Sequence, residues 1–229
     1  FLANIGASQI VSVGIHATPE TNPELAEAIP SIEFLGFDVT LFGVFIMIIL
    51  GSIYGAAEYK CSAIRTSLLS ITNRSTFLVS KTLVWLVFSF FISFLSIFLT
   101  INMTHYVLGQ DGLLLFSLNG TVWFYIFLAS IAWTLLGLLA YIMALTFKTS
   151  IVPLLFLLPQ VYNLGTFLAN YISVAKFLPV ALGQGLIATS PQILEHNSLQ
   201  NILFLLCWNF SFLALAIYRL LKSDIGGGE

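Results

Sequence analysis

The residues of this chain whose types allow chemistry are its few charged side chains, and half of its Lys and Arg residues lie in one short stretch. Residues 58–81 read EYKCSAIRTSLLSITNRSTFLVSK and hold one acid and four of the chain's eight Lys and Arg residues. Apolar side chains such as Ile64 and Leu68 recur at helical spacing, with Lys60 and Arg65 on other faces. This pattern is typical of an amphipathic helix that lies on a membrane or docks into a partner's groove. A second interpretation, in which the cations only anchor the connector on one side of a membrane, stays open.

The sequence carries no motif for catalysis of its own. It contains no GxxxxGK[ST] phosphate loop, no GxSxG nucleophile turn and no HExxH metal pair. Its three His and two Cys residues are scattered, which predicts neither a metal site nor a disulfide. Acidic residues are almost absent from the centres of the apolar stretches, which argues against a proton-coupled carrier. We therefore expect no enzyme activity, no metal and no cofactor in this chain.

The composition places the chain in a membrane. Hydrophobic residues make up 59% of the sequence and charged residues 8%, whereas soluble domains carry about 25% charged residues. Eight scattered cations form no basic face, so nucleic acid is not an expected partner.

Long apolar stretches predict an all-α, polytopic transmembrane bundle. A spanning helix needs about 20 mainly apolar residues. Alternating strands of a barrel would show polar side chains at every second position, and these stretches are apolar on all sides. The predicted spans are Val39–Ala57, Thr82–Met103, Thr121–Phe147, Ile151–Tyr171 and Leu199–Leu221.

The cations predict the orientation, because Lys and Arg prefer the cytoplasmic side of a membrane. If each span crosses once, seven of the eight cations share one side and only Lys176 lies on the other. We therefore expect a multi-pass protein of the cell membrane with cytoplasmic basic loops. The cations on that side are Lys60, Arg65, Arg74, Lys81, Lys148, Arg219 and Lys222.

The remaining segments complete a single predicted membrane domain, residues 1–222. We interpret residues 1–16 as the end of an additional first span, with an external amphipathic segment as the alternative. Residues 17–38 are interpreted as an external segment with a short helix. Residues 172–198 are predicted to be external, and residues 223–229 to be a flexible tail.

The basic connector resembles the signature of type-2 permeases of ABC transporters. In that family a span ends in Glu, an aromatic or basic pair follows, then an IRT-like step, a Leu pair, and Arg and Lys before the next span. A Gly usual in the family is replaced here by CSA, while KFLPVALGQGLI resembles the family's external segment before the last span. The matching positions are Glu58, Tyr59, Lys60, Ile64, Arg65, Thr66, Leu68, Leu69, Arg74 and Lys81.

This resemblance implies an architecture of six spans and a set of partners. Two such permeases, identical or homologous, pair with two cytoplasmic ATPase subunits, which bind ATP and Mg. A coupling helix in the connector would dock on the ATPase, and the positions from Glu58 to Arg74 would receive its motion. We expect Glu58 and Arg65 to act as a hinge-and-contact pair, with snorkelling of Glu58 to the interface as the alternative.

Two further patterns concern helix packing and transport. Gly51 and Gly55 form a GxxxG pair, for which packing within one subunit is favoured over a dimer contact. In the fourth span, Pro153 and Pro159 predict kinks. A polar stripe follows, which faces either other helices or a substrate path at the permease dimer interface, since lipid-facing polar groups are costly. The stripe consists of Gln160, Asn163, Thr166 and Asn170.

The resemblance implies export, and the small Phe-rich chain is similar to compact bacterial permeases that expel antimicrobial or cytolytic peptides. A mostly apolar route suits an amphipathic or hydrophobic substrate taken from the bilayer, with membrane lipids as neighbours. A secondary carrier or channel and a non-transporting membrane scaffold are the alternatives.

Overall fold

A computed structural model describes residues 32–59, 74–109, 112–113, 118–161, 171, 173–187 and 198–222. Within these ranges all regular secondary structure is helical, which confirms the predicted all-α class. Four of the described helices are long and apolar enough to cross a membrane. They are α3 (Phe37–Ala57), α5 (Arg74–Leu108), α6 (Gly120–Phe147) and α10 (Ser198–Lys222).

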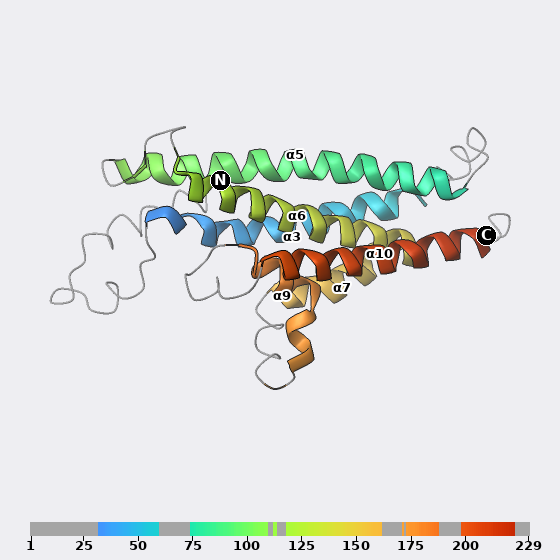
Figure 1. The fold of residues 1–229 in the computed structure, drawn as a ribbon. Helices are drawn as coiled ribbons and strands as arrows, with labels where there is room; N and C mark the ends of the chain where they lie inside the picture. Colours follow the sequence, from blue (N-terminus) through green and yellow to red (C-terminus); the bar gives the residue numbers. More distant parts are fainter. Residues whose placement is uncertain are drawn as a thin grey trace.

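Helix α6 forms the centre of the bundle. The long helices run side by side, and α3, α5 and α10 all pack against α6 (Figure 1). Nearly every residue of α6 from Leu128 onward is buried, whereas α5 and α10 leave large apolar side chains such as Phe91 and Leu203 exposed. In a water-soluble protein such surfaces would be costly, and in a bilayer they contact lipid.

Helix α5 begins earlier than predicted. It starts at Arg74 rather than at Thr82, so residues 74–81 form its first two turns and the connector is shorter than expected. This stretch contains neither Gly nor Pro, and Phe77 and Leu78 are buried in the bundle. Helix formation therefore continues outward past the apolar run that marked the predicted boundary.

The predicted fourth span is described only in its first half. Helix α7 covers Ile151–Pro159, and residues 162–170 lie outside the described part of the chain. Pro153 sits in the first turn, where the backbone N–H needs no helical partner, so the structure gives no reason for the predicted kink there. Pro159 coincides with the end of α7, and a π-type turn follows at residues 160–161.

Residues 173–187, which belong to the segment predicted to be external, pack against α6 and α10. A 3₁₀ turn, η5 (Ser173–Phe177), leads into the short helix α9 (Pro179–Gln184). Gly183 of α9 lies so close to Leu136, in the middle of α6, that an added Cβ would be 2.6 Å from its Cδ1 atom. Trp208 of α10 donates a hydrogen bond to the carbonyl of Phe177 at 2.9 Å.

Glycines allow α3 to approach the backbone of α6. A Cβ added to Gly51 would lie 2.2 Å from the carbonyl oxygen of Gly137, and one added to Gly55 would lie 2.5 Å from that of Tyr141. No side chain fits at such distances, so the GxxxG pair packs within one subunit, as favoured from the sequence. A 3₁₀ turn, η1 (Ile32–Phe34), precedes α3.

Candidate coupling site at one end of the bundle

Helices α3, α6 and α10 end, and α5 begins, at the same end of the bundle (Figure 1). Described cations predicted to share one side of the membrane gather there: Lys148 lies 5.7 Å above the ring of Tyr59, and Arg219 donates to the carbonyl of Thr146 at 3.1 Å. Lys81 belongs to the same cluster through Glu58. The structure therefore brings together charges that lie far apart in the sequence.

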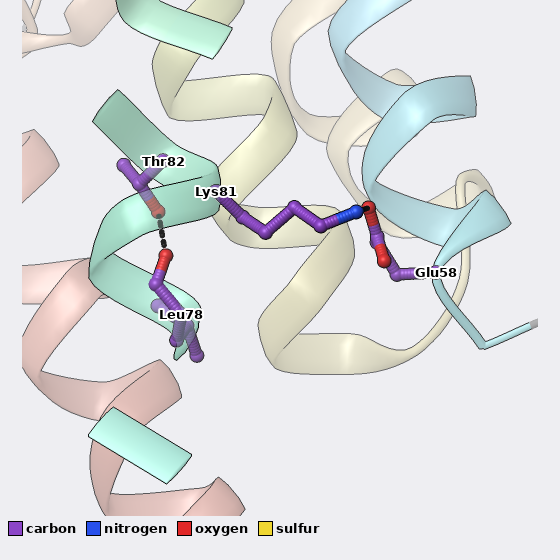
Figure 2. A network of polar contacts seen from close by, with 4 residues as sticks. All are labelled: Glu58, Leu78, Lys81 and Thr82. Atoms are coloured by element: carbon purple, nitrogen blue, oxygen red, sulfur yellow. Dashed lines mark hydrogen bonds and ion pairs between the residues drawn. The ribbon is translucent and has the colours of Figure 1, made fainter. Parts of the chain in front are cut away.

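An ion pair connects the two helices on either side of the basic connector. Lys81 Nζ on α5 lies 2.8 Å from Glu58 Oε1, which follows directly after α3 (Figure 2). The Glu58 side chain is only 8% exposed, whereas that of Lys81 is 35% exposed. Because a carboxylate this buried is costly without a counter-charge, Lys81 provides the compensation that keeps Glu58 inside the protein.

Tyr59 fixes the beginning of the connector against α6. Its hydroxyl donates a hydrogen bond of 2.7 Å to the carbonyl of Leu145. Burial, followed by the negative charge of Glu58, raises the pKa of Tyr59 to about 12, because both disfavour the phenolate. Tyr59 thus remains a neutral donor throughout the physiological range.

The Tyr59 phenol gives a spectroscopic prediction. We expect the difference between the alkaline absorbance titrations of the wild type and Tyr59→Phe to show one group with a midpoint near pH 12. Since the folded-state pKa exceeds the unfolded value of about 10, the contribution of Tyr59 to stability is complete below pH 10 and falls as the pH approaches 12. A difference midpoint near pH 10 would show that the phenol is solvated.

An aromatic stack closes the inner side of this site. Tyr54 of α3 stacks on Trp85 of α5 with ring centroids 4.9 Å apart, and Trp85 stacks on Tyr141 of α6 at 5.7 Å. Tyr141, together with Glu58 and Lys81, lines a small cavity. Stacked rings from three helices thus reach the cavity beside the ion pair through Tyr141.

The structure gives Glu58 the ion-pair partner Lys81 and leaves its side chain 8% exposed. Arg65, the other member of the predicted hinge-and-contact pair, lies outside the described residues, so that pair stays a prediction. Arg74, predicted in the connector, is the first residue of α5. Other predicted coupling residues lie outside the described part of the chain, so their role stays a prediction: Lys60, Ile64, Arg65, Thr66, Leu68 and Leu69.

The polar stripe is described at one position only. Gln160 is buried; its Nε2 donates to the carbonyl of Phe156 at 2.7 Å, and its Oε1 accepts from the backbone N–H of Val180 at 3.4 Å. At this position the structure shows helix packing, because Gln160 attaches α9 to α7. Asn163, Thr166 and Asn170 lie outside the described residues.

Sequence reasoning missed the ion pair of Lys81 with Glu58. It also missed that Lys148 lies above the Tyr59 ring and that Arg219 bonds to a carbonyl of α6. A signal for the pairing existed, since an acid directly after one span and a base just before the next lie at opposite ends of one connector. The hydrogen bonds from Tyr59 and Arg219 to backbone carbonyls of α6 could not be predicted from the sequence, because every residue has a backbone carbonyl.

Comparison of the chain with protein-family models, with curated proteins and with solved structures finds no match.

Proposed function

We propose that this chain is the membrane-spanning permease subunit of an ATP-driven exporter of the ABC type-2 class. The observation that carries the proposal is the ion pair between Glu58 and Lys81. Glu58 directly follows α3 and Lys81 lies in the second turn of α5, 23 positions further on, so the pair joins the two helices on either side of the basic connector. A force applied to the connector would therefore reach α3 and α5 at the same time.

The packing of the site supports this role. Tyr59 joins the start of the connector to the carbonyl of Leu145 in α6, and Lys81 lies within the second turn of α5. Since α6 contacts all the other long helices, a displacement at this end would be transmitted to the whole bundle. In this proposal the ATP and Mg are bound by two separate ATPase subunits, and a second permease completes the transport path.

The proposed substrate is an amphipathic or hydrophobic molecule, with antimicrobial or cytolytic peptides as the first class to test. The apolar outer faces of α5 and α10 support a substrate that enters from the bilayer. Export of such peptides would protect the cell that makes or meets them, with the basic loops in the cytoplasm.

The first experiment tests the docking role. The chain is co-expressed with the Walker-loop ATPase encoded by a neighbouring gene and purified through a tag on the permease. We expect the ATPase to co-purify, and the double change Arg65→Glu and Leu69→Glu to reduce its recovery at least tenfold with normal insertion of the permease. The control is Lys176→Glu, which reverses one positive charge in η5, away from the connector. Equal recovery and unchanged ATP turnover with the connector variant would contradict the coupling role.

The second experiment tests the substrate. Cells carrying both genes, either gene alone or neither are challenged with a panel of amphipathic peptides. We expect increased survival only when permease and ATPase are both present. Protection by the permease alone would favour a secondary carrier or channel, and absence of protection against the whole panel would refute the peptide class.

A further inference from the structure

An open groove of about 430 Å³ lies at the same end of the bundle, between the ends of α6 and α10. It is separate from the Glu58–Lys81 pair and shares no lining residue with the small cavity there. The residues that line it are Thr146, Phe147, Lys148, Tyr218, Arg219 and Lys222.

Three cations line this groove, and none of them has an acidic partner among the described residues. Within the described part of the chain, no carboxylate lies within 4.0 Å of Lys148, Arg219 or Lys222, and the one ion pair found there is Glu58–Lys81. Arg219 is held in place by a hydrogen bond of 3.1 Å to the Thr146 carbonyl and by its position 5.3 Å from the Phe147 ring. A guanidinium has five N–H donors, so this arrangement orients Arg219 and still leaves donors for an anion.

Exposed apolar side chains lie close in sequence to the residues that line the groove. On α10, Tyr218 of the lining is 58% exposed and Leu221 57% exposed, and Ile151, three residues after Lys148, is 61% exposed. The groove thus combines positive charge with a flanking surface suited to hydrocarbon, at the end of helices long and apolar enough to span a membrane. An anionic head group with attached acyl chains matches both features, whereas a soluble acidic partner would match only the charge.

We propose that this groove binds the phosphate of an anionic glycerophospholipid in the leaflet that adjoins the basic end of the bundle. Arg219 and Lys222 contact the phosphate, Lys148 contributes charge from the opposite wall, and the acyl chains lie along α10 and the start of α7. The proposal requires only that the chain is embedded in a membrane, so it stands or falls separately from the proposed ATPase coupling.

The test measures lipid binding to the purified full chain by native mass spectrometry in a delipidating detergent. Phosphatidylglycerol is compared with phosphatidylcholine of the same acyl chains, and glycerol 3-phosphate and inorganic phosphate serve as head groups without chains. We expect phosphatidylglycerol to bind at least tenfold more tightly than phosphatidylcholine. Since a cation near a lipid surface contributes about fivefold in affinity, Lys222→Gln should weaken phosphatidylglycerol binding about fivefold and leave phosphatidylcholine unchanged.

The control variant is Lys176→Gln, which removes one positive charge from η5 and should leave both affinities unchanged. Lys222 at the end of α10 is exposed and donates a hydrogen bond of 3.3 Å to the Tyr218 hydroxyl, so its replacement should leave the buried packing unchanged. Equal binding of the two lipids by the wild type, which needs no variant, would overturn the proposal. Unchanged binding by Lys222→Gln would overturn the site, and equally tight binding of glycerol 3-phosphate or inorganic phosphate would show that the ligand is a free anion.

Discussion

We expect Gly51→Ala to destabilise the protein by at least about 2 kcal/mol, because the added methyl group has no room between α3 and α6. The new Cβ would lie 2.2 Å from the carbonyl oxygen of Gly137, an atom of the backbone that cannot rotate away. The same carbonyl accepts a hydrogen bond from Trp85 at 3.3 Å, so moving it also disturbs α5. Overpacking of this kind costs on the order of 1–3 kcal/mol, and here two helices must separate.

Other glycines supply matched controls with the same chemical change. Around Gly120 nothing lies within 4 Å of an added Cβ, so Gly120→Ala should be neutral or slightly stabilising, since Ala favours helix over Gly by about 1 kcal/mol. Gly137→Ala should lie between the two, because its Cβ would be 3.3 Å from the carbonyl of Met47. The three variants would be ranked by heating each protein in detergent and measuring the fraction that still elutes as a folded peak in size-exclusion chromatography. A Gly51→Ala protein as stable as Gly120→Ala would refute the close approach of α3 to α6.

The second large effect concerns the buried ion pair, for which we expect Lys81→Met to cost about 2 kcal/mol of stability. This change leaves the carboxylate of Glu58, only 8% exposed, without its counter-charge. Removing one partner of a fully buried pair costs about 3–5 kcal/mol, and the expected value is lower here because Lys81 is 35% exposed.

A double-mutant cycle separates loss of the pair from loss of packing. Combining Lys81→Met with Glu58→Gln should restore at least half of the lost stability, since a neutral amide in the same place needs no counter-charge. Lys176→Met, at an exposed lysine without an ion pair in the described structure, should change little. Unfolding by sodium dodecyl sulfate in mixed micelles, monitored by circular dichroism, measures the four proteins of the cycle and the Lys176→Met control. Strictly additive effects of the two changes would mean that Glu58 and Lys81 do not interact.

Much of the fold followed from composition and periodicity. Spans at 39–57, 121–147 and 199–221 agree with α3, α6 and α10 to within two residues at each end. The agreement has a simple cause: a bilayer requires every backbone group to be paired within the segment, so an apolar run of sufficient length forms a helix whatever its neighbours are. The start of α5 was missed because a helix continues into polar residues when nothing stops it.

The candidate site was less visible, since its geometry depends on contacts between distant positions. The motif identified Glu58, Tyr59 and Lys81 as residues of interest, yet neither the pairing of Glu58 with Lys81 nor the bond from Tyr59 to the Leu145 carbonyl followed from spacing. Gln160 likewise belonged to a polar stripe in the sequence, and only the position of α9 shows where its amide oxygen is used.

By itself, the sequence determined the helical class and the long apolar helices that could cross a membrane, because both depend on the transfer of side chains and backbone groups between water and lipid. The shared side of the cations stays a prediction from the same sequence. Only the tertiary structure decided which helix is central, where α9 lies, and which charge neutralises Glu58. These features depend on directional contacts a few ångströms long, such as a glycine against a carbonyl or an ammonium against a carboxylate. Such contacts arise between residues that the chain's order alone does not bring together.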